Sequence, residues 1–127
     1  MVAFTGLDTR GHGAQLPIAL TFVDKNHPIT RGMEDWTTIK EELYNNLKVW
    51  ETSTPLVYGA QGQTKNVVAW VNDFHGTRVF STTLGHNNET INDPRYLDLV
   101  TRGLLWSVNK LSAENLKGPA ASAVPKP

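Results

Sequence analysis

The chain has 127 residues, 39% of them hydrophobic, with 12 basic and 12 acidic side chains and no cysteine. This length suits one domain with a hydrophobic core, and a zero net charge without a basic patch argues against nucleic acid as a partner. The lack of cysteine excludes disulfides, thiolate metal sites and a cysteine nucleophile. No apolar run approaches the ~20 residues of a membrane-spanning helix, so no membrane partner is expected. The first residues lack the pattern of a signal peptide, which leaves the compartment open.

Strand patterns dominate the chain up to about residue 60. Residues 17–24 (PIALTFVD) carry β-branched and apolar residues at nearly alternating positions, which predicts a strand. Residues 37–46 (TTIKEELYNN) mix helix formers with Thr, Ile and Tyr, so the pattern leaves helix and strand both open. Residues 47–52 and 54–60 are short strand candidates.

The clearest pair of elements follows. Asn66 to Phe74 is nearly all apolar up to Val71, which predicts a strand buried on both faces. A short turn at residues 75–77 leads into a second strand over residues 78–85. We expect an antiparallel hairpin within the sheet.

The last predicted element is a helix over residues 94–110. Asp93 suits the N-cap and Pro94 the first helical position. Apolar residues recur at helical spacing, and we expect four of them to pack on the sheet: Leu97, Val100, Leu104 and Val108. Residues 112–127 are small and Pro-rich towards the end, which predicts a flexible tail after a domain over residues 1–111.

A polar cluster follows the second hairpin strand and precedes the helix: Gly85, His86, Asn87, Asn88 and Glu89. Ligands of open α/β sheets bind beyond the carboxyl ends of strands, and histidine both titrates near neutrality and ligates metals. The cluster is therefore a candidate site. A plain surface loop with turn-forming asparagines is the alternative from the residues alone.

Glu41 and Glu42 are the next candidates. In a strand, neighbouring side chains point to opposite faces, so only one of the two could face a site. Tyr44 would share a strand face with Glu42 and could orient its carboxylate. A solvated face is the alternative. His12 lies between two glycines near the terminus, where fraying is the alternative. The four histidines have no close spacing, so spacing by itself supports a metal site only weakly.

Taken together, the segments VDKNHPITRGM, KEELYNNLKVW, RVFSTTLGHNNET and YLDLVTRGLLWSVNK resemble the trehalose-utilisation, or ThuA-like, family. The resemblance covers roughly residues 4–110. It implies an α/β fold like that of class I glutamine amidotransferases: a flavodoxin-like three-layer sandwich with a mostly parallel sheet, here truncated at the N-terminus and ending in a β-hairpin and a helix. Without a cysteine, glutaminase chemistry is not implied.

The resemblance also implies site residues. His86 and Glu42 would be the catalytic acid/base groups, with Tyr44, Asn88 and Glu89 binding the substrate. His12 and His86 would ligate a divalent metal such as zinc. The implied function is carbohydrate catabolism, on trehalose or a related sugar or keto-sugar, with the reaction undefined.

A non-catalytic carbohydrate-binding or protein-interaction module is the second hypothesis, with Trp36, Trp50 or Tyr58 as stacking surfaces. A truncated sheet would also leave an edge strand uncovered, and unpaired edges invite self-association. We therefore expect the isolated chain to form a homo-oligomer, to aggregate or to need its missing half.

Overall fold

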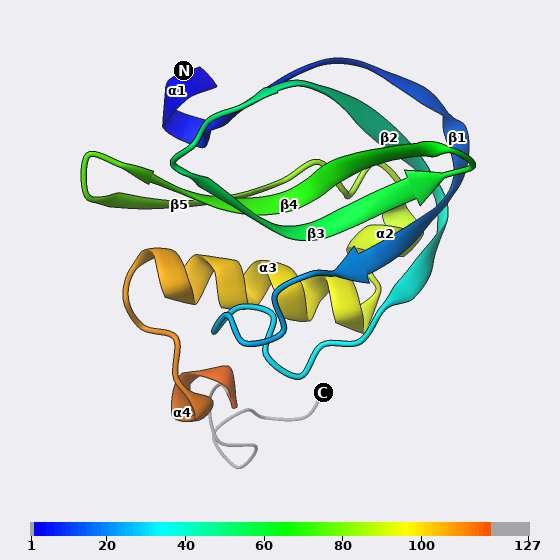
Figure 1. Cartoon of the computed structure of the whole chain (residues 1–127). Coiled ribbons are helices and arrows are strands. Elements are labelled where there is room, and N and C mark those ends of the chain that lie inside the picture. The colour runs from blue at the N-terminus through cyan, green and yellow to red at the C-terminus, as the bar shows by residue number, and fades with distance from the viewer. Residues whose placement is uncertain (1, 118–127) are drawn as a thin grey trace.

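Five antiparallel strands form one curved sheet in the computed structural model, which describes residues 2–117 (Figure 1). The strand order is β2-β1-β3-β4-β5. The bounds of the strands are β1 Leu7–Phe22, β2 Trp36–Val49, β3 Ser53–Gln61, β4 Thr64–Phe74 and β5 Thr77–Thr82. The helices are α1 Val2–Thr5, α2 Asn88–Ile91, α3 Pro94–Ser107 and α4 Ala113–Leu116. The chain is thus a mixed α/β protein.

The mostly parallel sheet implied by the family resemblance is not formed by the described residues, because all four of their strand pairings are antiparallel. Turns of two residues, 62–63 and 75–76, join β3 to β4 and β4 to β5. Connections that short allow only antiparallel pairing, since parallel strands need a crossover of a dozen or more residues.

The predicted hairpin of residues 66–74 and 78–85 is confirmed as β4 and β5, paired from Ala69–Thr82 to Phe74–Thr77. Its two-residue turn places His75 at φ 52° and Gly76 at φ 85°. Two consecutive positive φ values match the type I′ turn, whose twist suits a hairpin. His75 is exposed at the tip.

The longest pairing joins β1 to β2, from Leu7–Val49 to Leu20–Trp36. It makes the ambiguous segment 37–46 a strand and merges residues 47–49 into it. It also extends the expected strand 17–24 back to Leu7, so that His12 lies within β1 and not in a frayed terminus. Local pattern missed this extension because the polar residues of the segment gain their order from the partner strand.

The hydrophobic core lies mainly between the sheet and α3. Its fully buried members include Ile18, Leu56, Val68 and Leu99. A smaller cluster of Leu7, Val67 and Trp70 occupies the opposite face of the sheet, towards α1. Because β4 faces both clusters, residues 67–71 are all buried, as the continuous apolar run predicted.

Helix α3 begins as predicted, with Asp93 accepting a hydrogen bond from the Arg95 backbone N–H and Pro94 at the first position. The predicted packing stripe is wrong, however. Leu97 is 48% exposed, Leu104 62% and Val108 56%, and Val100 is only partly buried. The buried face instead centres on Leu99 and Gly103.

Close approach explains this choice of face. A Cβ at Gly103 would lie 2.3 Å from Cδ2 of Phe80, so only glycine lets α3 lie this close to β5. Such contact buries the flanking Tyr96, Leu99 and Trp106 against the core. The helical pattern considers only large apolar residues and so overlooks Gly103, whose missing side chain leaves room for the Phe80 ring.

The C-terminal segment is partly ordered within the described residues. Ser112 caps α4 by accepting from the Asn115 backbone N–H, so residues 113–116 are helical. The remainder of the predicted tail, residues 118–127, lies outside the described residues. No helix in the described part of the chain is long and apolar enough to cross a membrane.

Substitutions on the buried and the exposed face of α3 should change the free energy of unfolding by different amounts. Leu99→Ala should lower the free energy of unfolding by about 2–5 kcal/mol, because Leu99 is 1% exposed and its loss leaves a cavity. Leu104→Ala should change it by no more than about 0.5 kcal/mol, because the side chain is mostly in solvent. Urea unfolding of both variants measures the difference. Equal losses would contradict this assignment of the buried face.

Candidate functional site

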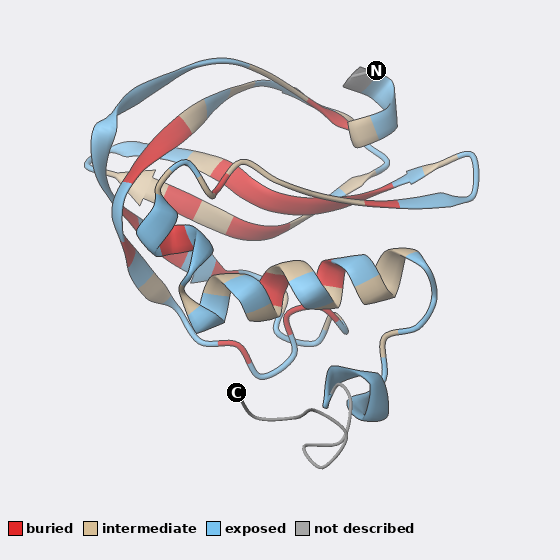
Figure 2. Ribbon diagram, turned by 180° about the vertical axis from the view of Figure 1, so that it is seen from behind, coloured by how far each residue is buried: buried red, intermediate tan, exposed pale blue. Residues whose placement is uncertain are grey.

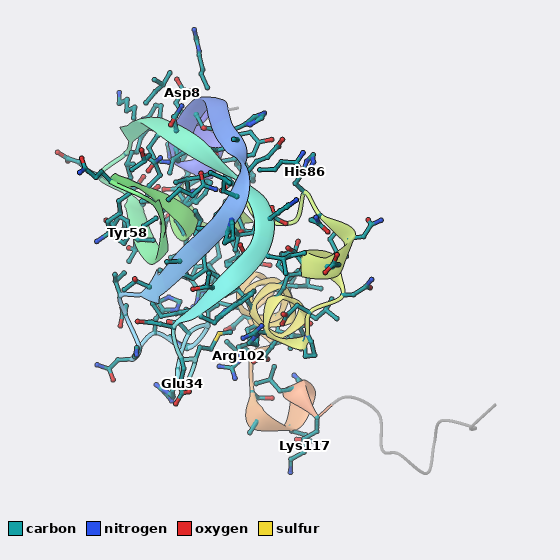
Figure 3. The ribbon with its side chains drawn as sticks, turned by 90° about the vertical axis from the view of Figure 1, so that its right-hand side faces the viewer. Asp8, Glu34, Tyr58, His86, Arg102 and Lys117 are labelled. Carbon is teal, nitrogen blue, oxygen red and sulfur yellow. The ribbon has the colours of Figure 1, made fainter. Side chains whose placement is uncertain are left out.

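The segment after β5 turns sharply and runs to the other edge of the sheet. Gly85 has φ 109°, and a Cβ there would lie 2.7 Å from the hydroxyl of Tyr96. Both observations require glycine. The turn delivers His86 beside β2, where it projects from the ribbon into solvent on one side (Figure 3).

A buried carboxylate holds this turn in place. Glu41 is fully buried, and its two oxygens accept the backbone N–H groups of His86, at 3.1 Å, and Asn87, at 3.0 Å. Burying a carboxylate is unfavourable unless hydrogen bonds satisfy it, and two backbone donors supply them here. The side chain of Glu41 therefore ties β2 to the segment that carries His86.

Glu42 is the centre of the site. One of its oxygens, Oε1, lies 3.2 Å from Nδ1 of His86 and accepts the hydroxyl of Tyr44 at 3.2 Å. The other, Oε2, lies 3.6 Å from Nε2 of His12. His86 and Glu42, the two acid/base groups implied by the family resemblance, therefore lie within hydrogen-bond distance of each other. Glu42 is 7% exposed, so a nearly buried carboxylate lies between two exposed imidazoles.

Of the two adjacent glutamates, only Glu42 contacts the imidazoles of His12 and His86, whereas Glu41 binds the backbone of the segment that carries His86. Their side chains do alternate, but β2 is an edge strand and the segment 85–87 lies along that edge. Glu41 reaches its backbone and Glu42 the His86 ring. A segment beside a strand edge can be contacted from both faces of the strand.

Gln15 completes the contacts of His86 and was not predicted. Its amide Nε2 lies 3.1 Å from Nε2 of His86. An amide nitrogen only donates, so His86 Nε2 accepts and Nδ1 carries the hydrogen that is donated to Glu42. The only signal for Gln15 is its register opposite Glu42 in the β1–β2 pairing.

His12 is held by its strand partner. It pairs in register with Tyr44, and the two rings lie 5.1 Å apart. Its Nδ1 donates to the carbonyl of Gly13 at 2.7 Å, which leaves Nε2 towards Glu42. Beside it lies a cavity of about 510 Å³, lined among others by His12, Leu16, Leu43, Asn45 and Gln61. Ligand pockets have volumes of this order.

Asn88 and Glu89 lie elsewhere. They are exposed in the first turn of α2, and no contact joins them to Glu42 or His86 among the described residues. Asn87 has the structural role expected of a plain loop, since its side chain caps α2 by accepting from the Glu89 backbone N–H at 2.9 Å.

The expected zinc pair, His12 and His86, finds no further support. Within residues 2–117, no group of three or more His, Asp or Glu side chains could hold a metal ion. Both imidazoles direct a nitrogen to the same carboxylate, so the three side chains form a hydrogen-bonding and ion-pairing chain.

Burial and nearby acidic groups raise the pKa of Tyr44 and of Tyr96. Desolvation is the largest cause for Tyr44, followed by its hydrogen bond to Glu42 and the negative charge nearby. Desolvation also raises the pKa of Tyr96, with a contribution from the charge of Glu41. Both phenols therefore remain protonated, and Tyr44 remains a donor to Glu42, up to higher pH than usual.

Comparisons with known proteins agree with this fold. A family model described as "Trehalose utilisation" matches residues 1–107. A ThuA-like protein from Bacteroides uniformis superimposes with a TM-score of 0.72 at 15% identity, over 88% of this chain and 52% of its own. A ThuA-like protein from Parabacteroides merdae gives 0.63 at 25% identity, over 91% and 44%. The chain thus spans about half the length of these solved structures. No curated protein matches it.

Exchanging the buried carboxylate for an amide tests the clamp on residues 86–87. In Glu41→Gln one of the two acceptor oxygens becomes an N–H₂ group that faces a backbone donor. We expect unfolding free energy to fall by about 1–3 kcal/mol, since a buried donor loses its partner. Urea unfolding measures it. Glu42→Gln is the control, since its partners are side chains near the surface, and it should cost clearly less.

The raised tyrosine pKa values predict a pH dependence. A phenol whose folded pKa exceeds its unfolded value contributes stability below about pH 10, and that contribution is lost as pH rises through the folded value. In an absorbance titration of phenolate formation, Tyr44 and Tyr96 should ionise at higher pH than a free tyrosine. Tyr44→Phe should remove one of these high-pH steps. A titration in which Tyr44→Phe removes no high-pH step would contradict the surroundings assigned to Tyr44.

Proposed function

Because the chain belongs to the trehalose-utilisation family, we propose that Glu42 and His86 form an acid–base pair acting on a sugar or keto-sugar. The observation that carries the proposal is the 3.2 Å approach of His86 Nδ1 to a nearly buried carboxylate, with Nε2 left as the acceptor. Since the chain spans about half the length of the solved relatives, the proposal concerns the part of the reaction that these residues supply.

The chemistry follows from the tautomer. Glu42 holds the Nδ1 hydrogen and orients the ring, so Nε2 is the atom that takes a proton. The carboxylate then stabilises the imidazolium that forms. Gln15 occupies Nε2 in this structure, and a substrate O–H or C–H group replaces it on binding. His12 faces the other oxygen of Glu42 and serves as a second proton-transfer group.

The choice of substrate rests on the family and on the cavity beside His12. Sugars carry many hydroxyls, and keto-sugars also carry acidic hydrogens next to a carbonyl. The cavity beside His12 combines apolar Leu16 and Leu43 with the amides of Asn45 and Gln61, which suits a sugar ring and its hydroxyls. We assign Asn88 and Glu89, exposed on α2, to the binding of sugar hydroxyls.

The alternative of an aromatic sugar-binding module is not favoured. Lys48 lies 4.3 Å from the ring centre of Trp50, Arg95 4.1 Å from that of Trp36, and Lys65 4.8 Å from that of Tyr58. A cation over an aromatic side chain occupies the ring face on which a sugar would stack.

A flavodoxin-like, mostly parallel sheet is also part of the proposal. We assign a parallel sheet to the length of the family members that this chain does not match, because the described residues account for an antiparallel sheet.

Hydrogen exchange at carbon tests the acid–base pair directly. With mono-keto trehalose in D₂O, the chain should accelerate deuterium incorporation next to the carbonyl, as followed by proton NMR. His86→Ala should lower the protein-catalysed rate by about 10²–10⁴-fold, the usual contribution of a general base. Glu42→Gln should lower it as well, because the ring loses its orienting carboxylate.

The matched control is His75→Asn. His75 is an exposed histidine at the hairpin tip with positive φ, which asparagine tolerates. The rate of deuterium incorporation with this variant should equal that with the wild type. Equal rates for wild type and His86→Ala, with both folded by circular dichroism, would overturn the proposal.

A further inference from the structure

The side-chain amide of Gln15 contacts the atom of His86 that the proposed reaction uses. Its Nε2 lies 3.1 Å from Nε2 of His86, and the amide makes no other hydrogen bond within residues 2–117. Gln15 lies in the stretch of β1 over residues 10–17, which is exposed to solvent along the curved arm of the sheet (Figure 2). A ligand can therefore reach the amide and Nε2 of His86 together.

A second glutamine of the sheet, Gln61, has a different environment. Its Nε2 donates to the backbone carbonyls of Leu16, at 2.9 Å, and Glu41, at 3.2 Å. These carbonyls belong to β1 and β2, so the amide of Gln61 helps to hold the strands together. The amide of Gln15 has no backbone partner in the part of the chain that the structure describes. The side chain of Gln15 therefore adds no hydrogen bond to the backbone framework.

The other donors around Glu42 already have acceptors that the reaction leaves in place. Tyr44 and Nδ1 of His86 donate to the carboxylate. Nδ1 of His12 donates to a backbone carbonyl. The N–H₂ group of Gln15 is different, because its acceptor is the Nε2 lone pair of His86, which takes the substrate proton. When substrate binds, this amide needs a new acceptor close to the reacting carbon.

We propose that Gln15 donates to the carbonyl oxygen of a keto-sugar while His86 removes a proton from the neighbouring carbon. The inference rests on the proposed function of Glu42 and His86. Preorganised side-chain amides stabilise oxygen atoms on which negative charge develops. Because the carbonyl carbon adjoins the carbon that loses the proton, the donor for its oxygen must lie beside the base, where Gln15 is.

The step is balanced without a co-reactant. The proton moves to Nε2 of His86, the electrons of the C–H bond form a C=C bond, and the electrons of the C=O bond move to the oxygen, which becomes an enolate. Glu42 balances the charge of the imidazolium, and the Gln15 amide stabilises the enolate oxygen. After the Nε2 hydrogen exchanges with D₂O, the imidazolium returns a deuteron to the same carbon. The substrate class is thus a sugar with a C–H bond next to a carbonyl.

Deuterium incorporation into mono-keto trehalose, measured over a range of substrate concentrations, tests this role of Gln15. Gln15→Ala should lower kcat by about 10²–10³-fold, the usual effect of removing one donor to a developing oxyanion. KM should stay nearly unchanged, because the donor is needed mainly when charge develops on the oxygen. Gln15→Glu keeps the shape of the side chain but replaces its N–H₂ group by an oxygen, so its kcat should fall at least as far.

The matched control is Gln63→Ala, since Gln63 is exposed in the turn between β3 and β4 and its side chain makes no hydrogen bond to the described residues. Its kcat and KM should equal those of the wild type. Urea unfolding should show Gln15→Ala as stable as the wild type, which separates a catalytic from a structural role.

Three results would overturn the role of Gln15 and leave the acid–base pair standing, provided that His86→Ala still loses activity. These are a wild-type kcat in Gln15→Ala, a raised KM at unchanged kcat, and a faster rate, which would make Gln15 a cap on the base. Absence of exchange with the wild type would overturn the acid–base pair and the role of Gln15 together.

Discussion

The pairing of β1 with β2 is the constraint on which the site depends. It places His12 opposite Tyr44 and Gln15 opposite Glu42. Four side chains from two separate segments of the chain therefore come together. Neither strand has a strong local pattern over this stretch, and each is ordered by the other. The site is therefore as rigid as this two-stranded arm of the sheet, and any change that shifts its register would move the carboxylate away from both histidines.

Glu41 couples that arm to the rest of the chain. Its buried carboxylate is satisfied by two backbone donors from a turn 45 and 46 residues away in sequence. Such charge-assisted bonds are short and directional, and they position the backbone from which the His86 ring reaches Glu42. Gly85 and Tyr96 shape the same turn through a contact that admits no Cβ. The two adjacent glutamates thus have different roles. Glu41 binds the backbone of the segment, and Glu42 contacts the ring of His86.

In helix α3, one small residue determines which face is buried. Large apolar side chains occur around much of the helix, and the sheet covers the part centred on Gly103 because the Phe80 ring packs directly on this glycine. The flank that remains is apolar and solvent-exposed, next to an unprotected strand edge. These features have a common physical origin, because the strands formed by the described residues cover only one side of α3.

The sequence by itself determined the elements with strong local signals. Alternation and a short turn predicted the β4–β5 hairpin, and Asp93 with Pro94 predicted the start of α3. The family motifs indicated Glu42, Tyr44 and His86, and their neighbourhood is what the structure contains. Only the tertiary structure decided the strand at residues 37–46, the buried face of α3, and the parts played by Gln15 and Glu41. These depend on strand register and on the packing of a side chain against a glycine, which involve residues far apart in the chain and leave no periodic signal in either segment.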